Sequence, residues 1–220
     1  MNAYFILNSA LNLIGALVAL AVSYYGFRYG KVTGSSFLKT LSLGFMMLGV
    51  GLLAQASAFI FFDLDAVRLA DRGTFVYSAT MIYLALQAVA YLMITVSYAR
   101  RVQGGSKAAV ETAGLAVLAL SQPSSLLLLG THLFELGELV LVVLLAMIVF
   151  QGGLIYGESK NRLALMVLGS FSLLLVAHVA ELSASLLSSG LLYLVGDLVQ
   201  LAGFGLLLLF VLRSGPDGRN

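Results

Sequence analysis

The sequence predicts an all-α integral membrane protein, a bundle of seven transmembrane helices with its N-terminus outside and its C-terminus inside. The prediction rests on composition, on the length of the apolar runs and on where the basic residues lie. Sixty percent of the 220 residues are hydrophobic and 10% are charged, against roughly 45–50% and 25% in soluble domains. So few charged side chains cannot coat a water-facing surface, and the apolar excess would aggregate. We therefore expect a multi-pass protein of the cell membrane, with lipid as its surroundings.

Seven predominantly apolar runs have the length of about 20 residues that a helix needs to cross the hydrocarbon core. The first run has no basic residues ahead of it and is longer than a signal-peptide core, so it is expected to stay attached as a helix. The fourth is the weakest, because polar residues and Pro123 interrupt it. The runs are 4–27, 37–62, 74–99, 108–130, 133–156, 163–188 and 191–212.

Basic residues predict the direction of the helices, because lysine and arginine of short loops stay on the cytoplasmic side. If all seven runs cross and the N-terminus is outside, only Arg68 and Arg72 lie outside. If the fourth run does not cross, the basic residues divide six against six, so seven crossings are favoured. The ten residues predicted inside are Arg28, Lys31, Lys39, Arg100, Arg101, Lys107, Lys160, Arg162, Arg213 and Arg219.

Matching landmarks predict an internal repeat within a single transmembrane domain, residues 1–220. Gln87 precedes Arg100 by thirteen residues, and Gln200 precedes Arg213 by thirteen. Tyr29-Gly30 and Tyr156-Gly157 each precede a charged turn. Repeat 1 would cover about 4–100, the connector helix about 108–130 and repeat 2 about 133–213. Because one helix connects them, the two triplets would run in the same direction, related by an axis along the membrane normal.

This three-plus-one-plus-three plan resembles the SWEET and PQ-loop transporters and the microbial rhodopsins in architecture. Their motifs are missing: only the reversed pair Gln122-Pro123 occurs, and no lysine lies in the seventh helix to hold retinal. Tyr29-Gly30 with its basic turn, and Leu43-Gly44-Phe45, resemble uncharacterised prokaryotic membrane proteins built on three-helix units. That second resemblance implies no activity.

Ionisable side chains within a membrane are costly unless they are paired or hydrated, so each one is a functional candidate. Helix direction and a rise of about 1.5 Å per residue place five of them in the outer half of helices five to seven. Asn8, Asn12 and Gln55 occupy the same outer half. Three interpretations stay open: ordinary packing with the side chains reaching surface water, a proton or cation site, or a divalent metal site. The five are Glu135, Glu138, His178, Glu181 and Asp197.

A polar path toward the middle is the second candidate feature. Tyr83, Gln87 and Tyr91 recur every four residues and share one face of the third predicted helix. Gln87 and Gln200 lie near the midplane at equivalent repeat positions, where they would either hydrogen-bond to each other or line a permeation path. Gln55 would extend that path outward. The abundant glycines, among them Gly44, Gly49, Gly51, Gly203 and Gly205, are typical of closely packed membrane helices.

Several function classes are excluded by residue content. The absence of cysteine removes thiol catalysis and thiolate metal sites, and a single deep histidine, His178, argues against haem. No sequence pattern indicates an enzyme or a cofactor, and a net charge of +2 does not indicate nucleic acid. We expect a small-solute or ion transporter or channel with an outer acidic vestibule. The alternatives are a non-catalytic helical subunit of a larger membrane complex and an intramembrane sensor. Besides membrane lipid, the partners that we consider are other membrane subunits or further copies of this chain in a homo-oligomer.

Overall fold

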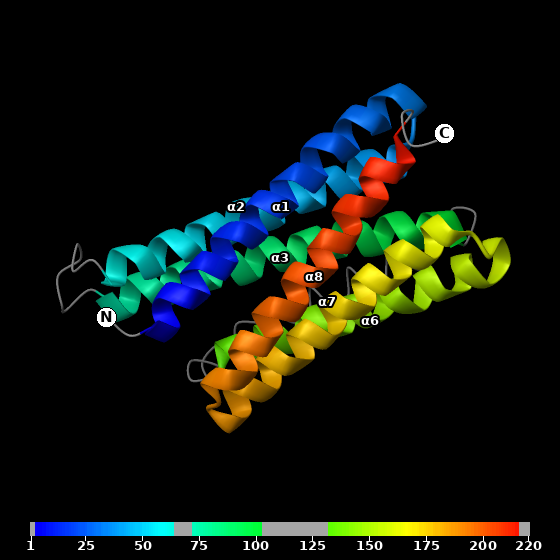
Figure 1. Cartoon of the computed structure of the whole chain (residues 1–220). Helices are drawn as coiled ribbons and strands as arrows, with labels where there is room; N and C mark the ends of the chain where they lie inside the picture. Colours follow the sequence, from blue (N-terminus) through cyan, green and yellow to red (C-terminus); the bar gives the residue numbers. More distant parts are fainter. Residues whose placement is uncertain (1–2, 64–71, 103–131, 216–220) are drawn as a thin grey trace, which may run out of the picture.

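The computed structural model describes residues 3–63, 72–102 and 132–215, which form six long α-helices (Figure 1). All six are long and apolar enough to cross a membrane. The predicted runs agree with them to within a few residues, except that 108–130 lies outside the described residues. The helices are α1 (Ala3–Thr33), α2 (Ser36–Asp63), α3 (Arg72–Val102), α6 (Leu133–Ser159), α7 (Arg162–Leu187) and α8 (Gly190–Ser214).

Three tight turns join neighbouring helices into antiparallel hairpins. Gly34, between α1 and α2, has a φ of 69°, in the left-handed region that glycine adopts without strain. Lys160 ends α6 and Ser188 ends α7 in the same left-handed conformation, which commonly stops a helix. Asn161 then caps α7 by accepting a hydrogen bond from the Leu163 amide at 3.0 Å. These local signals explain why such apolar helices end where they do.

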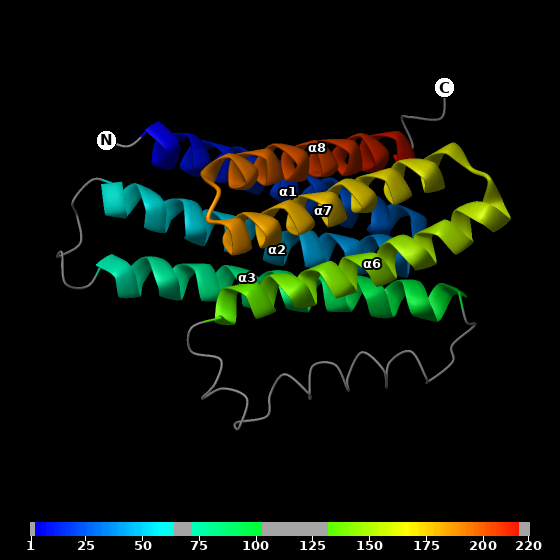
Figure 2. The same ribbon diagram turned by 90° about the horizontal axis from the view of Figure 1, so that it is seen from below.

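The helices form a closed ring in the order α1, α2, α3, α6, α7, α8, with α8 returning to α1 (Figures 1 and 2). Contacts along α3 and α7 show that these two helices are antiparallel, because Tyr91 meets His178 while Tyr98 meets Phe171. Since α6 and α7 form a hairpin, α3 and α6 must run in the same direction, as Figure 2 shows. The chain therefore leaves α3 at one end of the bundle and enters α6 at the opposite end.

A second parallel junction joins α1 to α8. Asn8 meets Asp197 at one end of the two helices, Gly15 faces Phe204 in the middle, and Tyr29 lies against Gly215 at the other end. Each triplet, α1–α3 and α6–α8, thus meets the other through its first and third helices. The first helix of each triplet lies parallel to the third helix of the other.

The outer surface of the ring is apolar. No more than 44% of the most apolar stretch of any of the six helices is buried, so more than half of the residues in each stretch keep some exposed surface. Large exposed side chains such as Phe150, Val176 and Leu198 cover that surface. In water such a surface would drive aggregation, whereas in lipid it needs no cover. The described fold is that of a multi-pass membrane protein.

Close helix contacts occur at some of the glycines that the sequence singles out. A Cβ at Gly49 would lie 2.8 Å from the Leu20 side chain, and one at Gly203 would lie 3.0 Å from Leu174. Gly205 differs from the prediction, because no atom lies within 4 Å of the position of its Cβ. It is two residues from Gly203, so it faces away from the helix that Gly203 contacts.

Candidate functional site: a buried carboxylate and histidine cluster

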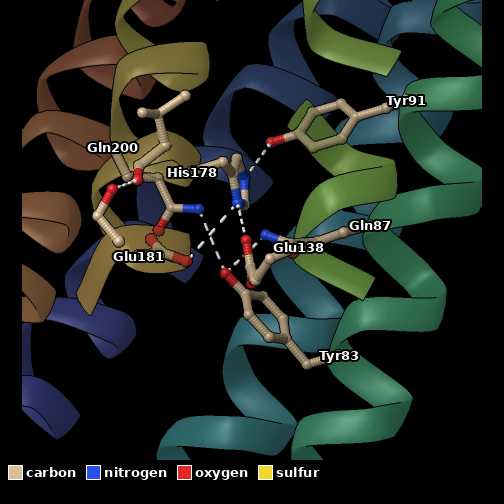
Figure 3. A network of polar contacts seen from close by, with 9 residues as sticks. Tyr83, Gln87, Tyr91, Glu138, His178, Glu181 and Gln200 are labelled. Atoms are coloured by element: carbon tan, nitrogen blue, oxygen red, sulfur yellow. Dashed lines mark hydrogen bonds and ion pairs between the residues drawn. The ribbon is translucent and has the colours of Figure 1, made fainter. Parts of the chain in front are cut away.

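Glu138, His178 and Glu181 form a compact cluster between α6 and α7 (Figure 3). His178 Nδ1 lies 2.9 Å from Glu138 Oε2 and 3.6 Å from Glu181 Oε2. The relative exposure of these side chains is 0% for His178, 1% for Glu138 and 8% for Glu181. The spacing of three residues places His178 and Glu181 on one face of α7, toward the first turns of α6.

Tyr91 of α3 contacts the other nitrogen of the imidazole. Its Oη lies 3.3 Å from His178 Nε2, and the two rings meet edge to face. Among the described residues, the polar atoms that contact Nδ1 are carboxylate oxygens, so we assign the proton of a neutral ring to Nδ1. In that tautomer Nε2 accepts the Tyr91 hydroxyl proton. The imidazole is therefore held from both sides.

The Tyr83 hydroxyl joins the two glutamines of the polar path. It accepts hydrogen bonds from Gln87 Nε2 at 2.6 Å and from Gln200 Nε2 at 3.2 Å. A direct hydrogen bond between Gln87 and Gln200, one of the two alternatives that the sequence left open for them, is not made. The physical reason is that Tyr83 lies one turn before Gln87, and its longer side chain carries the hydroxyl to a position between the two amides (Figure 3).

A cavity of about 250 Å³ opens beside the cluster, and every described helix contributes to its wall. Nine of the eleven lining side chains are polar, and three of those are carboxylates. Among the described residues, no lysine or arginine lines it. The lining residues are Asn8, Asn12, Gln55, Phe59, Thr80, Tyr83, Phe134, Glu138, Glu181, Tyr193 and Asp197.

Asp197 lies across this cavity, on α8. Its Oδ2 accepts a hydrogen bond from Asn8 Nδ2 at 2.7 Å, and Asn8 in turn accepts one from Asn12 at 2.8 Å. This chain joins α8 to α1 at their parallel junction. Asp197 faces the same cavity as Glu181, but it is outside the group of ligand atoms that lie within 4.8 Å of one another.

Glu135 lies apart from the cavity. It occupies the first turn of α6, accepts a hydrogen bond from Ser185 Oγ at 2.8 Å, and lies 3.8 Å from His132 Nδ1. A carboxylate in the first turn suits the helix dipole. Glu135 therefore belongs neither to the cavity nor to the cluster, whereas the other four ionisable candidates each contribute to one or both of them.

Inward of Gln87 and His178, the core of the described helices is mostly apolar. Phe45 and Phe204 lie edge to face there at 5.7 Å between ring centroids, and Phe171 and Leu207 are buried in the same core. The buried hydroxyls of this region, on Ser42, Thr95 and Ser170, donate to backbone carbonyls of their own helices. A second cavity, of about 280 Å³, lies at the other end of the helices, where Ser35, Tyr98, Asn161 and Ser214 are among its lining residues.

The sequence analysis did not select two of the polar residues that line the cavity, Thr80 and Tyr193. A signal for both exists in the helical spacing. Thr80 is three residues before Tyr83 and Tyr193 is four before Asp197, so each shares a helix face with a residue that the sequence did select.

Comparison with known proteins does not identify a family for this chain. The sequence matches no protein family model, and no curated protein or solved structure shows significant similarity to it.

Proposed function

We propose that the protein is a membrane transporter for a small cationic solute or an inorganic cation. The observation that carries the proposal is the cavity that three carboxylates line, with walls from all six described helices. Its volume of about 250 Å³ suits an ion with its waters or a small organic cation. We place the cavity in the outer half of the membrane, following the predicted orientation with the N-terminus outside.

The charge of the site supports a positive ligand. Glu138, Glu181 and Asp197 face the cavity, and His178 is the only cationic partner of any of them among the described ion pairs. Carboxylates in a poor dielectric without enough positive partners attract cations or protons strongly. An anionic solute would be repelled.

The arrangement of the two triplets supports alternating access. Transporters built on parallel repeats move one half against the other around a central site. Here the triplets meet at two similar parallel junctions, and an apolar core around Phe45 and Phe204 separates the cavities at the two ends. Movement of one triplet against the other would close one cavity and open the other.

Seven crossings and the predicted orientation are part of this proposal. The parallel directions of α3 and α6 support a crossing by residues 103–131, because the chain must return from one end of the bundle to the other between these helices. With seven crossings, Lys160 and Arg162 share the cytoplasmic side with Arg28 and Lys31, which agrees with the retention of basic residues there.

Cation flux into proteoliposomes tests the proposal. The purified chain would be reconstituted, and currents recorded on adding Na⁺, K⁺, Mn²⁺, Zn²⁺ or methylammonium, or on imposing a proton gradient. We expect at least one of these probes to give a current that Asp197→Asn abolishes or reduces about tenfold, since a ligand contact of a charged group is worth about 1.4 kcal/mol or more. Glu135→Gln is the matched control, because it removes a carboxylate outside the cavity.

The opposite results separate transport from a subunit role. No current with any probe, or equal currents for the wild type and Asp197→Asn, would overturn the proposal and leave the helical subunit of a larger complex as the better explanation.

A further inference from the structure

We propose that Glu138, His178 and Glu181 bind one divalent transition-metal ion and that Tyr91 orients the imidazole for it. The inference deepens the proposed function. It rests on that function in one respect only, which is that the bound ion is the transported solute. The binding site itself stands on the geometry of the three side chains and can be tested without any transport measurement.

The spacing of the donor atoms fits such an ion. Metal bonds to imidazole nitrogen and carboxylate oxygen are about 2.0–2.2 Å long, so neighbouring ligand atoms lie about 3.0 Å apart around an octahedral ion and about 3.4 Å apart around a tetrahedral one. His178 Nδ1 lies 2.9 Å from Glu138 Oε2 and 3.6 Å from Glu181 Oε2, and each of the three residues offers a donor atom within 4.8 Å of a donor atom of the other two. Small side-chain adjustments would complete the coordination.

The kinds of donor atom indicate the class of metal. One imidazole and two carboxylates, without a thiolate, suit Mn²⁺, Fe²⁺, Co²⁺, Ni²⁺ or Zn²⁺, whereas Cu⁺ prefers sulfur. Mg²⁺ and Ca²⁺ prefer sites made of oxygen alone. The nitrogen of His178 therefore favours a first-row transition metal over the alkaline-earth ions.

A divalent ion would also balance the charge of the buried group. Two ionised carboxylates carry −2, and a protonated His178 offsets only half of it. Buried charges without partners cost several kcal/mol each, and the only described ion-pair partner of Glu138 and Glu181 is His178. When a divalent ion binds and the imidazole is neutral, the complex of the ion with the three side chains has no net charge.

An unpartnered atom points independently to a ligand. Glu138 is completely buried, and its Oε1 has no hydrogen-bond partner although Oε2 is bonded to His178. Buried polar atoms are almost always satisfied, so this oxygen implies a donor or an ion. A metal that Glu138 binds through both oxygens would satisfy it. Gln87 Oε1, also buried and unpartnered, belongs to the same network (Figure 3) and is free to accept from a metal-bound water.

Tyr91 has the position of an orienting partner. Histidine ligands of metals usually donate their second N–H to an oxygen, which fixes the ring and strengthens the ligand. When Nδ1 binds the metal, the ring proton resides on Nε2, which lies 3.3 Å from Tyr91 Oη and would donate to it. Glu138 and Glu181 both line the cavity, so the ion would have a route for entry and exchange.

Metal binding by the purified full chain tests the site. Protein in detergent, stripped with a chelator, would be titrated with Co²⁺ by visible absorption, and Zn²⁺ would then be added as a competitor. We expect one Co²⁺ per chain, displaced by Zn²⁺, and a loss of affinity of more than about tenfold in Glu181→Gln and in His178→Gln. Glu135→Gln is the control, since it removes a carboxylate from the same end of the bundle without touching the cluster.

Tyr91→Phe separates an orienting role from mere packing. The phenyl ring keeps the shape of the side chain, so one ion per chain should still bind, with affinity about 10- to 100-fold lower. Tyr91→Phe leaves all three ligand residues in place. It therefore still tests the site if a substitution of a ligand residue prevents folding.

Two outcomes would overturn the metal proposal. One is a wild-type chain that neither binds Co²⁺ nor retains Zn²⁺, and the other is unchanged affinity in Glu181→Gln, His178→Gln and Tyr91→Phe. Cation flux without metal binding would remove the metal site and leave the transport proposal intact. Metal binding without flux of that metal or any other probe would remove transport and leave a resident metal site.

Discussion

Glu138 on α6 and His178 on α7 form a wholly buried carboxylate and imidazole pair, with 2.9 Å between Oε2 and Nδ1. Forty residues apart in the chain, they join two helices beside the cavity of about 250 Å³ that Glu138 helps to line. Burial of either group alone would be unfavourable, because its polar atoms would lose water without gaining a partner.

This pair should show strong energetic coupling. Glu138→Leu or His178→Leu alone leaves a buried polar partner uncompensated, which costs about 3–5 kcal/mol. The double substitution should cost less than the sum of the two, by about 1–3 kcal/mol. Unfolding in mixed detergent and denaturant micelles, followed by circular dichroism, measures all four proteins of the cycle. Additive effects would contradict a direct interaction.

Tyr83→Phe should destabilise the bundle by about 1–2 kcal/mol. The substitution removes the oxygen that accepts hydrogen bonds from Gln87 and Gln200, and both amides then lie buried without that partner. The same unfolding measurement applies. Tyr24→Phe is the matched control, because Tyr24 is 63% exposed and should show no change. A stable Tyr83→Phe protein would show that water replaces the hydroxyl.

Two glycines of α8 should respond oppositely to alanine. Gly203→Ala places a Cβ 3.0 Å from Leu174 and 3.2 Å from the Ser170 carbonyl, so α7 and α8 must separate, at a cost of about 1–3 kcal/mol. Gly205→Ala meets nothing within 4 Å and should be neutral or stabilising by up to about 1 kcal/mol. The difference in melting temperature between these variants is the readout. Equal effects would argue against close packing of α7 and α8 at Gly203.

Cysteine labelling should reveal the seventh crossing. The chain has no cysteine, so single cysteines can be introduced at Arg101, His132, Ser159 and Ser189. A membrane-impermeant maleimide should label His132→Cys and Ser189→Cys in intact cells, and Arg101→Cys and Ser159→Cys only after permeabilisation. Labelling of Arg101→Cys and His132→Cys from the same side would show that 103–131 does not cross.

The positions of the described helices were predictable from sequence, because they depend on local properties. Without water in hydrocarbon, each segment must satisfy its own backbone groups and so forms a helix across its whole apolar length. The turns carry local signals as well, such as Gly34 with its left-handed conformation and Asn161 as a cap.

The common level of Glu138, His178, Glu181 and Asp197 along the bundle also followed from sequence, because helix direction and the rise per residue place residues along the helix axes. Which of them touch did not follow. Glu135 and Glu138 are three residues apart on α6, yet one meets Ser185 and the other meets His178.

The sequence by itself thus determined that the chain forms helices able to cross a membrane and, to within a few residues, where the described helices begin and end. Only the tertiary structure decided that Tyr83 stands between Gln87 and Gln200, and that His178 is held by Glu138 and Tyr91. The reason is that these helices are apolar on all sides, so no amphipathic stripe reveals the buried face. Their rotation is set by the packing of all six described helices together.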